Sequence, residues 1–165
     1  VLTLLPIYAL QQGFTQQQAL HMASVVVIGD AALQLPLGWL ADRLSRRLLF
    51  AACGLGLMLS SLAIPLVLQG LALWPLLVLF GASAGGLFTL ALILIGEHFR
   101  DDALVRANAH VAQLWGLGCL LGPLLTGAAS QWLTGHALPL LMALGAAGFV
   151  VVVWRRPPFA QGSQA

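Results

Sequence analysis

Asp30 is the residue of this sequence whose type and position best suit the binding of a proton or a substrate. It is the one acidic residue inside a long apolar segment, near the middle of residues 19–40. A charge at the centre of a bilayer costs roughly 2.5–3.5 kcal/mol on insertion scales, so an acid at that depth usually faces a cavity or a partner. A carboxyl group there can bind and release a proton, which makes Asp30 a candidate proton or substrate site. The alternative is a neutral Asp30 that only joins two helices through a hydrogen bond.

Two further polar side chains, His110 and Gln113, lie three residues apart in another apolar segment. That spacing places them on one face of a helix, and Asn108 adds to the polarity of the same region. We take His110 and Gln113 as further candidates for a proton- or substrate-binding cavity. Hydrogen bonding between helices is the competing interpretation.

One pentapeptide, Gly81-Ala82-Ser83-Ala84-Gly85, has the G-x-S-x-G pattern of a serine nucleophile. An intramembrane serine protease would also need a histidine near Ser83 in depth. The histidine that lies inside an apolar segment, His110, is close to one end of it, whereas Ser83 lies half-way along its own segment. The depths match poorly. Protease activity is therefore the runner-up hypothesis, and we expect no catalytic residues.

The sequence carries no motif for metal or cofactor chemistry. Cys53 and Cys119 lack metal-ligand spacing and fall inside apolar segments, where small packing residues are the ordinary interpretation. A phosphate-binding loop of the form G-x-x-x-x-G-K-[ST] requires lysine, which the sequence lacks. We therefore expect no metal ion, no cofactor and no ATP-driven step within this chain.

The elements that position these residues follow from composition. Of the 165 residues, 60% are hydrophobic and only 7% are charged. Ordinary soluble domains have about 25% charged residues, so this chain cannot cover a soluble surface, and a disordered chain would be polar. Basic residues are not interleaved with aromatic ones, so nucleic acid is not an expected partner. The composition predicts an integral membrane protein in a lipid bilayer.

Apolar segments of membrane-spanning length alternate with short polar turns along the chain. The full segments approach the about 20 residues that a transmembrane helix needs, and their apolar runs do not alternate as barrel strands do. We predict an all-α fold, a six-helix transmembrane bundle over residues 1–154 with its first helix truncated, followed by a tail over 155–165. The predicted spans are residues 1–10, 19–40, 48–68, 71–96, 104–129 and 137–154.

All the arginines follow the second, fourth or sixth predicted span, and the turns between the other spans carry none. Under the positive-inside rule, this distribution places the arginine-bearing turns and the C-terminus in the cytoplasm. The arginines are Arg43, Arg46, Arg47, Arg100, Arg106, Arg155 and Arg156.

Glycines four residues apart recur in two spans: Gly81 with Gly85, and Gly118 with Gly122. This spacing lets helix backbones approach closely in lipid. Pro123 directly follows Gly122 and should kink its helix. Helix packing is the main interpretation of these residues, and a flexible, bending helix pair is the other.

The turn after the second span carries the most informative motif, residues 38–47, with the sequence GWLADRLSRR. It resembles the G-x-x-x-D-R-x-G-R-R signature of the major facilitator superfamily, which lies on the cytoplasmic turn between the second and third helices of each half. Ser45 stands where the signature has its second glycine. Within the superfamily the chain resembles the YcaD-like bacterial transporters. The positions that match the signature in type and spacing are Gly38, Asp42, Arg43, Arg46 and Arg47.

This resemblance implies half of a twelve-helix secondary transporter in the bacterial inner membrane. The whole chain fits the C-terminal half, so the implied partner is the missing N-terminal six-helix half. The implied activity is transport of a small-molecule substrate by alternating access, as symport or antiport and coupled to protons. A free-standing membrane protein with a structural or assembly role is a further alternative.

The resemblance also implies a latch at the cytoplasmic turn. Asp42 should interact with the N-terminus of a helix in the other half, where the helix dipole is positive. Arg43, Arg46 and Arg47 should reach Glu97 at the end of the fourth span. Such a latch would hold the outward-facing state of the transporter.

Overall fold

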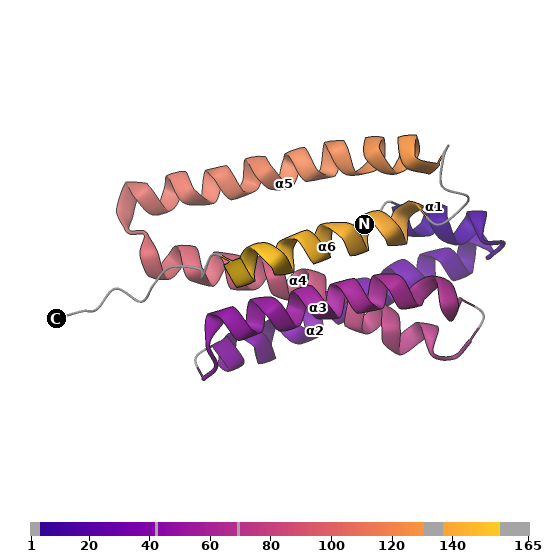
Figure 1. Ribbon diagram of the computed structural model, residues 1–165, viewed down its shortest axis with the longest axis horizontal. Helices are drawn as coiled ribbons and strands as arrows, with labels where there is room; N and C mark the ends of the chain where they lie inside the picture. The colour runs from indigo at the N-terminus through magenta and orange to yellow at the C-terminus, as the bar shows by residue number, and fades with distance from the viewer. Residues whose placement is uncertain (1–3, 42, 69, 131–136, 156–165) are drawn as a thin grey trace.

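The regular secondary structure of the described residues is entirely helical. The computed structural model describes residues 4–41, 43–68, 70–130 and 137–155. These ranges contain no strand, and the predicted all-α fold is confirmed (Figure 1). The elements are α1 (Leu4–Gln11), α2 (Gln16–Ala41), α3 (Arg46–Ala63), the 3₁₀ helix η1 (Ile64–Leu66), α4 (Leu73–His98), α5 (Asp101–Ser130) and α6 (Ala137–Arg155).

Helix α2 begins before the predicted span because its first residues form a capping box. The backbone N–H of Thr15 donates to Oε1 of Gln18 (3.0 Å), and the backbone N–H of Gln18 donates to Oγ1 of Thr15 (3.3 Å). This reciprocal pair satisfies N–H groups that the first turn of a helix leaves without partners. Just before it, Gly13 has a φ of +87°, a left-handed conformation that suits glycine.

Side chains of α3 satisfy its polar groups locally. Ser45 precedes the helix with an extended backbone, and its Oγ accepts from the backbone N–H of Leu48 (3.4 Å). The hydroxyls of Ser60 and Ser61 donate to carbonyl oxygens one turn earlier in the same helix, as serines in apolar helices commonly do. The chain then tightens into η1 at Pro65, because proline has no N–H to continue the helix.

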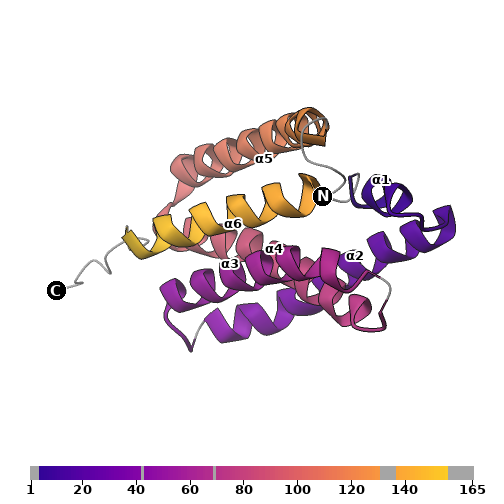
Figure 2. The same cartoon turned by 45° about the vertical axis from the view of Figure 1, so that its right-hand side comes forward.

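Helices α2, α3, α4 and α6 form one packed group, and α5 stands apart from it (Figures 1 and 2). The most extensive contact joins α2 to α4, while α3 packs against both α4 and α6, and α1 lies against α2. Helix α5 makes only sparse contacts with α4 and α6. Its described side chains from Asp101 to Ala128 are all exposed or half-buried.

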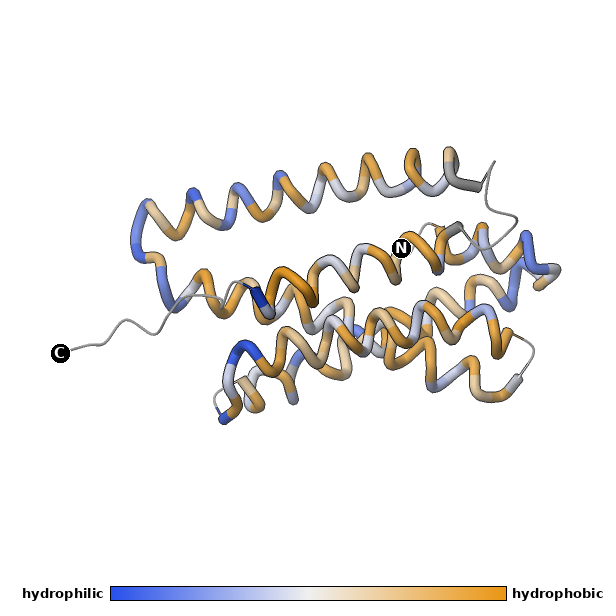
Figure 3. The backbone as a smooth tube through the Cα atoms, viewed as in Figure 1, coloured by the Kyte–Doolittle hydropathy of each residue, from blue (hydrophilic) through white to orange (hydrophobic). Residues whose placement is uncertain are grey.

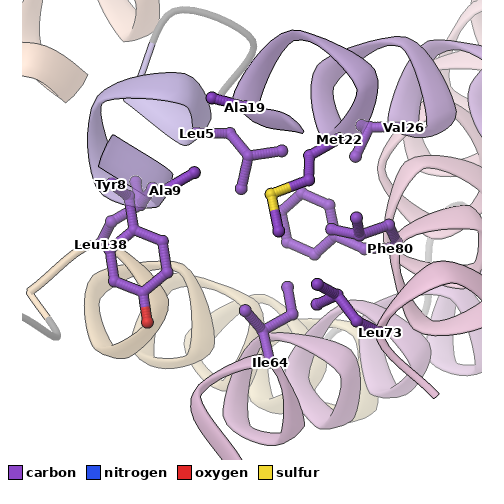
Figure 4. Close-up of a cluster of buried hydrophobic side chains, with 11 residues drawn as sticks. Leu5, Tyr8, Ala9, Ala19, Met22, Val26, Ile64, Leu73, Phe80 and Leu138 are labelled. Atoms are coloured by element: carbon purple, nitrogen blue, oxygen red, sulfur yellow. The ribbon is translucent and has the colours of Figure 1, made fainter. Parts of the chain in front are cut away.

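The core consists of two clusters of buried side chains, one towards each end of the packed group. The first cluster, drawn in Figure 4, joins α1, α2 and α4 with η1 and the start of α6. Its members are Leu5, Tyr8, Ala9, Ala19, Met22, Val26, Ile64, Leu73, Leu77, Phe80 and Leu138. The second cluster lies where α2, α4 and α6 end and α3 begins. Its members are Leu37, Ala41, Leu49, Phe50, Cys53, Leu90, Leu94 and Val153.

The described residues contain 4 segments that are long and apolar enough to cross a membrane by length and composition. They are Arg46–Leu66, Leu73–His98, Asp101–Ala128 and Leu138–Arg155. Large apolar side chains lie exposed along the helices while polar residues gather towards their ends (Figure 3). That arrangement suits a lipid environment around the helices. The chain is an all-α membrane protein.

Candidate functional site

Asp30 lies on α2 at the place where α2 meets α4. It is half-buried, and its Oδ1 accepts a hydrogen bond of 3.3 Å from Nε2 of Gln34, one turn further along the same helix. Gly85 of α4 lies directly opposite. A Cβ built on Gly85 would overlap with Oδ1 of Asp30 and would lie only 2.5 Å from its Cγ. The carboxyl group therefore occupies the space that a side chain at position 85 would fill.

Two other glycines bring the backbones of α2 and α4 into direct contact. A Cβ on Gly81 would lie 2.8 Å from the carbonyl carbon of Val26, and a Cβ on Gly29 would lie 2.9 Å from Cα of Val78. Both separations are too short for a real side chain, so both positions require glycine for helices this close. Gly29 was not singled out from the sequence, although a small residue directly beside Asp30 was a signal for close approach.

Two pockets of the described residues adjoin Pro139 of α6, one lined also by Leu5 and Phe80 and the other by Leu62 and Pro65. Their linings are almost entirely apolar side chains near the first core cluster, and neither lining includes Asp30 or Gln34. The contacts described for Asp30 are those with Gln34 on its own helix and with Gly85 of α4.

One end of the bundle, here named the arginine end, collects the ends of α2, α4 and α6 and the starts of α3 and α5 (Figure 3). An ion pair there joins Arg46 at the start of α3 to Glu97 in the last turn of α4. The two side chains are 23% and 43% exposed. A pair this open to solvent contributes at most about 1 kcal/mol. The described arginines of this end are Arg43, Arg46, Arg47, Arg100, Arg106 and Arg155.

Arg43 and Arg47 contact tryptophan residues in this chain, whereas Arg46 is the arginine of the motif that reaches Glu97. The guanidinium of Arg43 lies 3.9 Å from the centroid of the Trp39 ring. The guanidinium of Arg47 lies 5.2 Å from the centroid of the Trp154 ring, and its Nη2 donates to the carbonyl oxygen of Trp154 (2.6 Å). Each arginine has an indole ring within reach, and guanidinium groups stack favourably on such rings.

The other two residues of the motif have no described role in this chain. Asp42 lies outside the described residues, so its contact with another half stays a prediction. Gly38 lies within α2, and a Cβ built on it would meet no atom within 4 Å. No described atom of this chain approaches Gly38 closely enough to require glycine there.

His110 and Gln113 lie exposed on α5, away from Asp30. Nδ1 of His110 lies 2.7 Å from the carbonyl oxygen of Arg106, one turn earlier in α5. The ring of Trp115 packs against Phe88 of α4 with 5.0 Å between centroids. That ring contact links α5 to α4, but the structure does not bring His110 or Gln113 together with Asp30.

The second glycine pair lies on α5 as well, without a neighbouring helix. A Cβ built on Gly118 or Gly122 would meet no atom within 4 Å. Helix α5 runs continuously through Pro123. A packing partner for Gly118 and Gly122 is therefore not found in the described part of the chain.

Ser83 faces α3 and is buried, with 6% of its surface exposed. A Cβ built on Gly56 of α3 would lie 3.5 Å from Cβ of Ser83. The histidine that the protease hypothesis requires, His110, bonds within its own helix instead. No described hydrogen bond joins Ser83 to His110, so the geometry gives the protease hypothesis no support.

Comparison with known proteins identifies the family whose members this chain is similar to. The family profile described as Major Facilitator Superfamily matches residues 1–165. An uncharacterised MFS-type transporter of Yersinia enterocolitica is 28% identical over 154 residues, which cover 93% of this chain and 40% of that protein. The uncharacterised MFS-type transporter YcaD of Escherichia fergusonii is 29% identical over 140 residues, which cover 85% of this chain and 36% of that protein. No solved structure matches.

Proposed function

Because this chain belongs to the major facilitator superfamily, we propose that it forms one half of a proton-coupled secondary transporter for a small solute. Membrane transport as such follows from the family and from relatives that are MFS-type transporters. The half-transporter organisation, alternating access and the coupling ion are the content of the proposal. The observation that carries the coupling is Asp30, a half-buried acid between α2 and α4.

The proposed partner is an N-terminal six-helix half of the same transporter. The chain spans only 40% of its Yersinia enterocolitica relative and 36% of its Escherichia fergusonii relative. Helix α5 supports this organisation, since its apolar side chains such as Leu114, Leu120 and Leu124 are 62–68% exposed. In the proposed cycle the two bundles rock against each other around a solute bound between them.

The arginine end faces the cytoplasm in this proposal, and the membrane is the bacterial inner membrane. The orientation follows from the positive-inside rule, because no predicted turn at the opposite end carries an arginine or a lysine. The relatives that support the bacterial inner membrane come from Yersinia and Escherichia. The C-terminus then lies in the cytoplasm.

Asp30 is suited to carry the coupling proton because its charge has no described cationic partner. The ion pair of the described residues lies at the arginine end, between Arg46 and Glu97. Gln34 contributes a hydrogen bond to Asp30 but no charge. A bound proton is therefore the means by which this chain can neutralise Asp30 inside a membrane, where an ionised carboxylate is costly.

The transporter that contains this chain, reconstituted in proteoliposomes, tests the proposed transport. The vesicles are incubated with a mixture of small metabolites under an imposed pH gradient, and mass spectrometry identifies the solutes of the lumen. We expect at least one solute to accumulate with the gradient and to leave when an ionophore collapses it. Failure of every solute to follow the gradient, in either direction, contradicts a proton-coupled transporter.

Replacement of Asp30 by asparagine tests the coupling site itself. Asp30→Asn keeps the shape and much of the hydrogen bonding but removes the titratable group. We expect gradient-driven accumulation to be lost while downhill exchange of the solute continues. Asp102→Asn, at an exposed acid in the first turn of α5, is the matched control and should accumulate solute normally. Unchanged accumulation in Asp30→Asn would show that the coupling acid lies elsewhere.

A further inference from the structure

We propose that Gly85 is a positioning residue for Asp30, so that the coupling site extends over two helices. The space left by the missing side chain of Gly85 holds the carboxyl group of Asp30 against the backbone of α4. Helix α2 supplies the acid, and α4 determines where the acid points. The inference rests on the proposed function only in that Asp30 is taken to bind the coupling proton.

The two glycines of the same G-x-x-x-G pair meet different kinds of atom on α2. The three atoms nearest to a Cβ on Gly81 all belong to the backbone of Val26. The two atoms nearest to a Cβ on Gly85 are Oδ1 and Cγ of Asp30, and Cα of Asp30 follows at 3.3 Å. Helix packing alone explains Gly81, because the backbone of α2 fills its space. At Gly85 the carboxyl group of Asp30 fills the space, so this glycine leaves room for the acid.

The position of the carboxyl group matters because a turn of α2 next to Asp30 is open. Ala31, Ala32 and Leu33 are all exposed, so an acid turned to their side would not be covered by any helix of this chain. We call the space left by the missing side chain of Gly85 the notch. In the notch the carboxyl group is covered by α4, and Nε2 of Gln34 donates a hydrogen bond to Oδ1 from the next turn of α2. Gly85 thus keeps the proton-binding group within the protein.

The notch also links charge to helix packing. The carboxyl group of Asp30 is itself part of the surface on which α4 packs, because no side chain of Gly85 separates the two helices at this level. Gain or loss of a proton therefore changes a group that belongs to the contact between α2 and α4. Protonation and the fit of these two helices depend on the same atoms.

A double-mutant cycle on thermal unfolding tests the contact without any knowledge of the solute. In the purified full-length transporter we expect Gly85→Ala to lower the unfolding midpoint, because its methyl group and the carboxyl group cannot share one position. In the Asp30→Ala background most of that decrease should disappear, because the competing side chain is gone.

Gly81→Ala is the matched control for this cycle. Its methyl group meets the backbone of Val26, so its decrease in the midpoint should be the same with and without Asp30→Ala. Equal effects of Asp30→Ala on the Gly81 and Gly85 variants would overturn the inference, because both glycines would then serve helix packing alone.

Dicyclohexylcarbodiimide, which reacts with protonated carboxyl groups in apolar surroundings, gives a readout that packing alone would not change. We expect Gly85→Ala to raise the extent of labelling at Asp30, read by peptide mass spectrometry, because the displaced carboxyl group turns to the exposed side of α2. Gly81→Ala retains the glycine at position 85 and should raise the labelling of Asp30 less than Gly85→Ala does. Unchanged labelling in Gly85→Ala would also overturn the inference.

The failure of this inference and that of the proposed function are separate results. Coupling between positions 30 and 85 in the stability cycle, together with normal accumulation in Asp30→Asn, would retain the notch and reject Asp30 as the coupling acid. Lost accumulation in Asp30→Asn without coupling between positions 30 and 85 would retain Asp30 as the coupling acid and reject the role of Gly85.

Discussion

Single residues at the arginine end show how three similar side chains acquire three different partners. Arg46 pairs with Glu97, whereas Arg43 and Arg47 lie over the rings of Trp39 and Trp154. The motif spacing was enough to select these arginines from the sequence. The choice of partner was not predictable, because Trp154 and Glu97 reach the start of α3 only through the packing of α6 and α4.

A charge swap tests the ion pair at the arginine end. Arg46→Glu and Glu97→Arg should each lower the rate of solute transport, because each brings like charges together between α3 and α4. The half-exposed pair contributes at most about 1 kcal/mol, so removing it changes an equilibrium between transporter states by up to about fivefold. The double swap should recover most of the rate.

Arg100→Glu serves as the control for the swap, since Arg100 is an exposed arginine at the same end. Its rate should stay close to that of the wild type. A double swap that is slower than both single variants would indicate that the pair does not act as a pair in transport.

Among the elements, α2 shows what could and could not be taken from the sequence. Its apolar run predicted a span from residue 19, and the helix itself begins at Gln16, because of the reciprocal cap of Thr15 and Gln18, which was not recognised. The T-x-x-Q spacing was a visible signal for that cap. The contact of α2 with α4 was indicated by Gly81 and Gly85 alone, and the choice of α2 as the partner depends on the fold.

Removal of the cap on α2 should destabilise this helix measurably. Thr15→Ala removes the oxygen that accepts from the N–H of Gln18, and the loss of such a cap costs about 0.5–2 kcal/mol. Unfolding in mixed micelles with a denaturing detergent measures the change. Thr15→Ser retains a hydroxyl and should unfold like the wild type, and equal losses in both variants would argue against the cap.

For the molecule as a whole, composition was sufficient for the class of protein but not for the arrangement of its helices. The low charge and the long apolar segments predicted an all-α membrane bundle, and the family match and the helical structure confirm it. The separate position of α5 was not predictable, because its apolar segment resembles those of the packed helices. Only tertiary contacts distinguish a helix within a bundle from one beside it, and those contacts are sparse for α5.

Cysteine accessibility tests the proposed orientation of the whole bundle. In a background with Cys53→Ala and Cys119→Ala, a cysteine at Gln17 should react with a membrane-impermeant maleimide added to intact cells. A cysteine at Ser45, which precedes α3 at the arginine end, should react only after the cells are permeabilised. Labelling of position 45 in intact cells would reverse the proposed orientation.

The close approach of α2 to α4 has a consequence for how this sequence can vary. An exposed leucine such as Leu66 or Leu71, 85% and 89% exposed, can be exchanged for another apolar residue with little effect on the packing within this chain. Gly29 and Gly81 allow no such exchange, because even a single methyl group would meet the backbone of the opposite helix. We therefore expect substitutions to be tolerated at such exposed leucines but not at Gly29 and Gly81, although neither glycine has a side chain that could take part in transport.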